Sequence, residues 1–210
     1  MKKISVVAII LIFAGFNTFA QLSQGMISVG GSLNLTISNH KNTQNSTTVN
    51  GPSKSQFLIR PSIEYFLSDR FSFGGGLSYY RSNEKDYPSG NNYTQKVSIF
   101  SITPFARMYF SMGEKVSLFG QGSIGFGFGK STSAIKNGNT ITSTESKMSN
   151  FELGVRPGFH YLVSGKLALE ATFGFVGFTS EKYNNKEDTD SSFQIDFSPA
   201  TLALGIRFFL

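Results

Sequence analysis

The sequence predicts an all-β fold, an eight-stranded antiparallel up-and-down barrel. Three observations predict it: apolar residues recur with a period of two, short and long connections alternate, and the composition is poor in helix formers. The 210 residues include 22 Gly, 22 Phe and 8 Tyr, which are mediocre helix-forming types. Cys is absent and His occurs twice. This composition excludes a disulfide scaffold, a thiol nucleophile and a Cys- or multi-His metal centre, so we expect no metal and no cofactor.

The N-terminus has the three parts of a secretory signal peptide. Lys2 and Lys3 precede an apolar run over 4–16, and the small residues Thr18 and Ala20 follow. A membrane anchor is the alternative, but the run is shorter than the roughly 20 residues that a spanning helix needs. We therefore expect cleavage between Ala20 and Gln21, which gives a signal peptide over 1–20 and a barrel domain over 21–210.

The alternation of apolar and polar residues indicates strands. Ile27, Val29 and Leu33, for example, alternate with Ser28, Gly30 and Ser32, and this period of two is typical of a strand with one buried or lipid-facing side. The predicted strands cover 27–37, 57–67, 71–81, 95–111, 116–130, 150–163, 167–180 and 192–210. We expect the alternation to slip near Phe100 and again near 198–201.

The connections between these strands alternate in length. Tight turns are predicted at 68–70, 112–115 and 164–166, and long polar loops at 39–54, 82–94, 131–148 and 181–191. Short turns at one end and long loops at the other describe an up-and-down meander. A β-sandwich would mix its loop lengths.

The polar face decides whether the barrel is soluble or spans a membrane. Gly, Ser, Thr, Asn and Gln dominate that face, whereas most Lys residues lie in the predicted loops and turns. A soluble lipid-binding barrel would show water a face rich in Lys and Glu, so a small polar face indicates a membrane barrel with a crowded lumen. The segment 57–67 is long enough, at about 3.3 Å per residue and a tilt near 40°, to cross the apolar layer.

Aromatic residues are concentrated toward both ends of the predicted strands, as expected for two rings of side chains at the membrane surfaces. The β-propensity of Phe and Tyr is an alternative explanation. The set near the tight turns comprises Tyr65, Phe66, Phe71, Phe73, Tyr109, Phe110, Tyr161, Phe208 and Phe209, and the set toward the loops comprises Tyr79, Tyr80, Phe126, Phe128, Phe151 and Phe178.

Seven charged residues fall on the predicted lumenal face. An Arg recurs once per hairpin, which predicts that the four Arg side chains lie at one height around the barrel axis. Charges in a confined interior are costly unless paired, so we expect an ion-pair network. It can act as a plug or as a selective gate, and an eight-stranded lumen nearly filled by side chains favours the plug. The set is Arg60, Glu64, Arg107, Glu152, Arg156, Glu170 and Arg207.

The C-terminal strand ends in a pattern that points to a family. Gly205, Phe208 and Leu210 have the spacing of the C-terminal insertion signal of outer-membrane barrels, with Leu210 in place of the usual Phe and Ala203 in place of a polar residue. Over 24–210 the chain resembles the outer-membrane protein A/X-type eight-stranded β-barrel family of Gram-negative bacteria. The resemblance implies a monomer in the outer membrane, periplasmic termini, four external loops and insertion by the barrel-assembly machinery. The expected partners are outer-membrane lipid, lipopolysaccharide phosphates at the loop cations, and an extracellular ligand at the loops.

Three features that imitate functional sites have structural interpretations. The stretch 120–125 matches a dinucleotide-binding pattern, but another alternating strand follows it where a helix is required. His160 lies on the lumenal face without the Ser and acidic partners of a hydrolase. The basic residues, which give a net charge of +6, are spread over loops rather than clustered, so no nucleic acid is expected.

Four functions remain after these exclusions. The first is a structural or surface-interaction role, by adhesion or ligand contact, with a plugged lumen and no enzymatic activity. The second is a narrow pore for ions or small solutes. A lipid-modifying enzyme and a soluble secreted lipid-binding barrel are weaker alternatives.

Overall fold

A computed structural model describes residues 22–44, 47–86, 92–138, 140–184, 189–198 and 201–210. Almost all of them lie in strands, because apolar and polar residues alternate along most of the chain. The strands are β1 (Ile27–Gln44), β2 (Thr47–Phe66), β3 (Phe71–Asp86), β4 (Asn92–Ser111), β5 (Val116–Asn137), β6 (Thr140–Ser164), β7 (Leu167–Thr172), β8 (Phe175–Tyr183), β9 (Thr189–Asp196) and β10 (Ala203–Phe209). Within the described part of the chain, no helix is long and apolar enough to cross a membrane.

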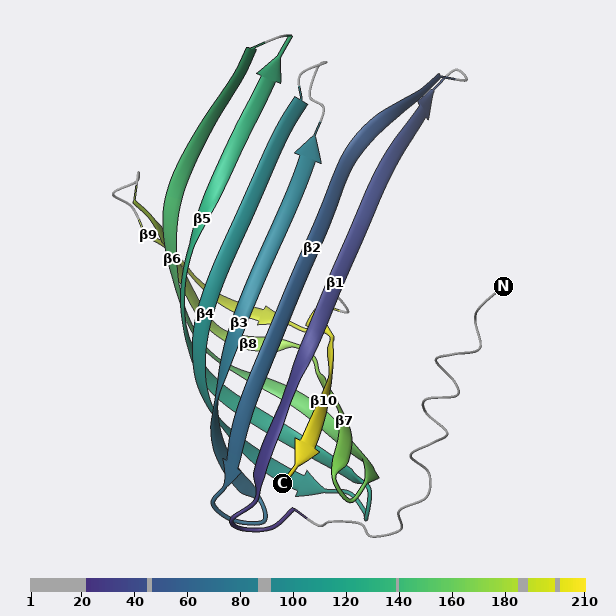
Figure 1. The fold of residues 1–210 in the computed structure, drawn as a ribbon, viewed down its shortest axis with the longest axis vertical. Helices are drawn as coiled ribbons and strands as arrows, with labels where there is room; N and C mark the ends of the chain where they lie inside the picture. Colours follow the sequence, from purple (N-terminus) through teal and green to yellow (C-terminus); the bar gives the residue numbers. More distant parts are fainter. Residues whose placement is uncertain (1–21, 45–46, 87–91, 139, 185–188, 199–200) are drawn as a thin grey trace.

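Eight of these strands form a closed antiparallel ring (Figure 1). The ring runs β1, β2, β3, β4, β5, β6, β7 and β10, and it closes where β10 pairs with β1 through Ser28↔Phe209 to Leu33↔Leu204. β8 continues the seventh strand along the upper part of β6, and β9 pairs with β8. Among the described residues, β9 has no pairing with β1. The predicted eight-stranded meander is therefore confirmed.

Both the seventh and the eighth strand are interrupted, and the two breaks lie side by side. Gly174 separates β7 from β8 with a φ of +72°, a left-handed conformation that favours glycine. Its amide donates a hydrogen bond to Thr201 Oγ1 at 2.8 Å, and a Cβ at this position would lie 2.4 Å from the Phe197 ring. These contacts join the break in one strand to the break in the next.

Each break exchanges the faces of the strand that it interrupts. Leu169 faces outward before Gly174, but Phe175 after it is only 6% exposed and faces the lumen. The prediction of one uninterrupted strand over 167–180 is therefore wrong, because the extra residue at the break changes which parity points inward. In the eighth strand Ile195 and Ile206 both face outward, so the predicted slip at 198–201 is confirmed.

The predicted slip near Phe100 is wrong. β4 pairs with β3 without interruption from Phe71↔Met108 to Asp86↔Tyr93. Phe100 and Ile102 point outward, whereas Ile99 lines the lumen. The alternation of apolar residues changes near Phe100 because the apolar side chain of Ile99 lies on the lumenal face. The backbone register does not shift.

The strands extend much farther than the sequence predicts. Most of the polar segments predicted as loops, such as 39–54 and 131–148, continue the ladder, and β6 reaches 25 residues. At about 3.3 Å per residue such a strand is about 80 Å long, far more than an outer membrane requires. The hairpins β1–β2, β3–β4 and β5–β6 therefore extend well beyond β7 and β10 as paired ribbons (Figure 1).

The outer face of the ring is apolar and the inner face is polar or small. Large apolar side chains exposed on the outside include Leu33, Ile63 and Leu153, whereas Ser28, Glu64 and Arg207 are buried inside. This is the inverse of a soluble protein and matches a barrel whose outer wall faces lipid. The polarity decides against the soluble lipid-binding alternative.

Four aromatic residues that the sequence assigns to the membrane surfaces point inward instead. Tyr80, from the set toward the loops, lines the lumenal cavity, and the other three lie near the tight turns. Phe66, Tyr109 and Phe209 are at most 2% exposed and form a cluster with Leu22, Phe119, Leu162 and Ala168 at the tight-turn end of the lumen. Their neighbours Tyr65, Phe110 and Phe208 do face outward. We call this cluster of seven residues, together with His160, the aromatic plug.

Candidate functional site

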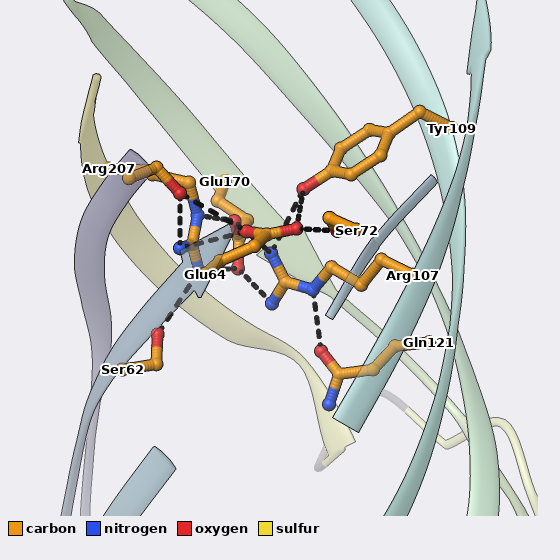
Figure 2. A network of polar contacts seen from close by, with 9 residues as sticks. Ser62, Glu64, Ser72, Arg107, Tyr109, Gln121, Glu170 and Arg207 are labelled. Atoms are coloured by element: carbon orange, nitrogen blue, oxygen red, sulfur yellow. Dashed lines mark hydrogen bonds and ion pairs between the residues drawn. The ribbon is translucent and has the colours of Figure 1, made fainter. Parts of the chain in front are cut away.

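Four charged side chains meet inside the barrel, directly above the aromatic plug, and form a closed cycle of ion pairs (Figure 2). Glu64 from β2, Arg107 from β4, Glu170 from β7 and Arg207 from β10 alternate in sign around it. The shortest N···O distances are 2.8 Å for Arg107–Glu170 and for Arg207–Glu170, 3.0 Å for Arg207–Glu64 and 3.4 Å for Arg107–Glu64. We call this arrangement the charge cycle; its formal charge is zero.

Hydrogen bonds satisfy the remaining polar atoms of the charge cycle. Arg107 grips Glu170 with both terminal nitrogens, at 2.8 and 2.9 Å, and its Nε donates to Gln121 at 2.8 Å. The Tyr109 hydroxyl donates to Glu64 at 2.8 Å, and the Ser72 hydroxyl donates to the same carboxylate. Buried charges are tolerated only when paired and hydrogen-bonded in this way.

The remaining Arg207 donors bind hydroxyls of the neighbouring strands. Its terminal nitrogens donate to Ser28 and Ser62 at 3.1 and 3.2 Å. The guanidinium of Arg107 also lies over the rings of Phe105 and Phe119, 4.9 and 4.6 Å from their centroids, a favourable placement for a cation. The cycle is therefore tied both to the strands around it and to the plug below it.

The aromatic plug packs inside the barrel below the charge cycle. The ring centroids of Phe66 and Tyr109 lie 5.4 Å apart, those of Tyr109 and Phe119 5.5 Å, and those of His160 and Phe209 5.4 Å. Gly158 makes room for this packing, since a Cβ there would lie 2.3 Å from the Phe119 ring. His160 is 1% exposed, and its ring nitrogens have no hydrogen-bond partner among the described residues.

A cavity of about 350 Å³ lies on the loop side of the charge cycle. Its lining includes Arg107 and Glu170 from the cycle, and Arg60, Glu152 and Arg156 higher in the barrel. Arg156 pairs with Glu152 at 2.8 Å, donates to Ser123 at 3.3 Å and lies over the Phe175 ring. Arg60 is exposed to the cavity and has no hydrogen bond or ion pair with any residue that the structure describes.

The seven predicted lumenal residues therefore fall into three groups rather than one network. Four form the charge cycle, Glu152 and Arg156 form a separate pair, and Arg60 stands apart. The prediction that the four Arg side chains share one height is wrong. Strands of a barrel are tilted and staggered, so one Arg per hairpin does not place the side chains in one layer.

Sequence reasoning missed the residues that complete the charge cycle and the plug. Tyr109 shares the parity of Arg107, Phe66 that of Glu64, and Phe209 that of Arg207. The alternation of side chains would therefore have placed all three inside the barrel. Their aromatic character instead led to their assignment to the membrane surface.

The two other predicted sites are terminal. The expected cleavage site between Ala20 and Gln21 lies outside the described residues. The C-terminal pattern forms the end of β10, where Gly205 pairs with Ser32 of β1 and Leu210 donates its amide to Ile27. Phe208 and Leu210 are both exposed on the outer face.

The fold and its polarity define the protein as an eight-stranded membrane barrel. The family model of the outer membrane protein beta-barrel domain matches residues 19–198, most of the chain. The protein therefore belongs to this outer-membrane family, and its place is the outer membrane. The comparison with curated proteins found no match.

Solved outer-membrane barrels have similar folds. The protein OprG from Pseudomonas aeruginosa is 11% identical with a TM-score of 0.51, and the match covers 91% of this chain and 99% of that one. The Yersinia pestis attachment invasion locus protein Ail is 14% identical, with a TM-score of 0.42 and coverage of 89% and 99%. Neisserial surface protein A is 18% identical, with a TM-score of 0.42 and coverage of 88% and 97%. At these identities the likeness to OprG shows the fold alone.

The charge cycle predicts a large stability loss when one carboxylate is neutralised. In Glu170→Gln, Arg107 and Arg207 share only Glu64, so a buried cation loses its compensation. We expect the free energy of unfolding to fall by about 3–5 kcal/mol, measured by urea unfolding of the barrel in lipid vesicles.

Glu145→Gln is the matched control. It breaks the exposed pair with Lys130, whose N···O distance is 3.2 Å, and such surface pairs contribute about 1 kcal/mol or less. Equal effects of the two substitutions would contradict a structural role for the charge cycle.

Proposed function

We propose that the protein is a closed, non-enzymatic barrel with a structural or surface-interaction role in the outer membrane. The observation that carries this proposal is the packing of two groups of buried side chains inside the ring. The charge cycle holds four mutually paired side chains, and the aromatic plug packs directly beneath it. A solute crossing the barrel would have to break both, because eight strands leave an interior about filled by side chains.

The surroundings of His160 support a role without catalysis. Its ring lies between Tyr109 and Phe209 and is almost completely buried. A general base has to reach the proton that it abstracts, and here aromatic rings cover the imidazole. We infer that His160 fills space in the plug rather than acting on lipid.

The tall hairpins support a role at the cell surface. They carry charged side chains above the apolar belt, for example the exposed pairs Lys54–Glu84 and Lys130–Glu145. The hydrogen bond from Lys54 to Glu84 raises the pKa of Lys54, so this cation persists at any physiological pH. Projecting paired ribbons offer polar backbone edges and side chains to an extracellular ligand.

Lipopolysaccharide is the proposed partner nearest to these hairpins. Its phosphates lie at the outer leaflet and would attract cations of the hairpins that rise from it. The lysines proposed for this contact are Lys41, Lys54, Lys136 and Lys147. Export through the segment 1–20, insertion by the barrel-assembly machinery through the end of β10, and a monomeric state complete the proposal.

Bilayer conductance tests the closed lumen. We expect the wild-type barrel to show no steady conductance in planar bilayers. The double variant Glu64→Ala/Arg107→Ala removes one anion and one cation from the cycle and should conduct. The control Lys130→Ala/Glu145→Ala removes a surface pair and should stay closed. Stepwise wild-type conductance that Arg107→Ala or Arg156→Ala abolishes would instead establish the narrow pore.

Charge reversal tests the lipopolysaccharide contact. Lys136 and Lys147 are exposed on the β5–β6 hairpin. Changing both to Glu should weaken binding of lipopolysaccharide to the detergent-solubilised protein several-fold, measured by co-migration in native electrophoresis. The same change at Lys115 and Lys166, in the tight turns at the opposite end, should leave binding intact. Equal binding by both variants would refute the contact.

A further inference from the structure

We propose that the cavity above the charge cycle is a binding site for a small oxyanion, with the Arg60 guanidinium as its main ligand-binding group. The chemical class is a phosphate, sulfate or carboxylate group. The proposal goes beyond a structural barrel, because it assigns a ligand to the half of the lumen that lies on the loop side.

Positive and negative charges are balanced in the charge cycle but not in the cavity above it. The charge cycle is neutral, with Glu64 and Glu170 compensating Arg107 and Arg207. Above it, Glu152 is committed to Arg156 at 2.8 Å. Arg60 thus adds a positive charge that no carboxylate of the described residues pairs with, and the upper cavity carries a formal excess of one positive charge.

Arg60 is placed where a ligand in the cavity can reach it. It lies on the inner face of β2, four residues from Glu64, and its side chain borders the cavity rather than the membrane. Arg156 and Glu152 line the same cavity as Arg60. Two Arg side chains in one confined cavity repel each other unless anions compensate both charges.

Hydroxyl groups line the cavity that Arg60 borders. They belong to Ser32, Ser62, Ser78, Ser101 and Thr103. Hydroxyls donate to oxyanions, and a guanidinium binds two of their oxygens at once with its planar fork of donors. A volume of about 350 Å³ suits a small ligand.

Equilibrium binding of inorganic phosphate to the refolded barrel in detergent micelles tests the proposal. The bound fraction is read from ³¹P NMR line widths over a phosphate titration. We expect Arg60→Gln to weaken binding at least tenfold and Arg60→Lys, which keeps the charge but loses the fork, to give an intermediate affinity. Arg81→Gln is the matched control, because it removes the same charge from the outer face of the adjacent strand β3 and should bind as wild type.

A second variant keeps the test decisive if Arg60→Gln does not fold. Ser78→Phe retains every charge and fills the space beside Arg60, so it should also abolish phosphate binding. Folding of each variant is checked by the shift in electrophoretic mobility on boiling in SDS. No phosphate binding by the wild type, or equal binding by folded Arg60→Gln, would overturn the proposal.

Added lipopolysaccharide identifies the source of the oxyanion. If it displaces inorganic phosphate from the wild type, a headgroup phosphate is the ligand; if phosphate is retained, the ligand is a free anion. Phosphate binding in micelles does not depend on conductance. The titration therefore tests the oxyanion site separately from the closed lumen.

Discussion

Four charges are confined inside a ring of eight strands, and the packing of the lumen follows from that confinement. Glu64, Arg107, Glu170 and Arg207 come from β2, β4, β7 and β10, and each anion contacts both cations. Their mutual attraction is strong where water is scarce, and so is the cost of leaving one unpaired. The charge cycle therefore links opposite walls of the barrel, and only a closed ring with these strands in register satisfies it.

Packing around the charge cycle follows from lack of space. Small residues on the inner face admit large neighbours: Gly158 accommodates Phe119, and Gly154 lies where a Cβ would be 2.2 Å from the Phe175 ring. Below the charge cycle, large rings packed against small residues form the aromatic plug. Above the cycle, side chains leave a cavity that Arg60 borders. The barrel thus has packed side chains toward its tight turns and a cavity toward its hairpins. The proposed closure and the proposed oxyanion site are compatible because they lie at different heights.

Local patterns in the sequence were enough to predict the barrel but not the layering of its lumen. Alternation correctly placed Glu64, Arg107 and Arg207 on the inner face, and the parity change at 198–201 was visible in the apolar residues. The sequence does not predict the break at Gly174, because Phe173 and Phe175 continue the alternation of apolar residues on either side of it. The sequence does not predict that the strands continue into the polar hairpins, because Ser, Asn and Lys occur in loops as well as in exposed strands. The separation of Arg60 from the charge cycle depends on strand stagger, which no single segment encodes.

The absence of cysteine from the sequence allows the closure of the lumen to be measured directly. Two single-cysteine variants, Ser101→Cys in the cavity wall and Ser117→Cys on the lumenal face beside the plug, are treated with a charged, membrane-impermeant thiol reagent added from the hairpin side of oriented vesicles. The account predicts rapid labelling of the first and protection of the second until the barrel is unfolded. Equal labelling of both would show that water and ions pass the charge cycle freely, and would contradict the closed barrel.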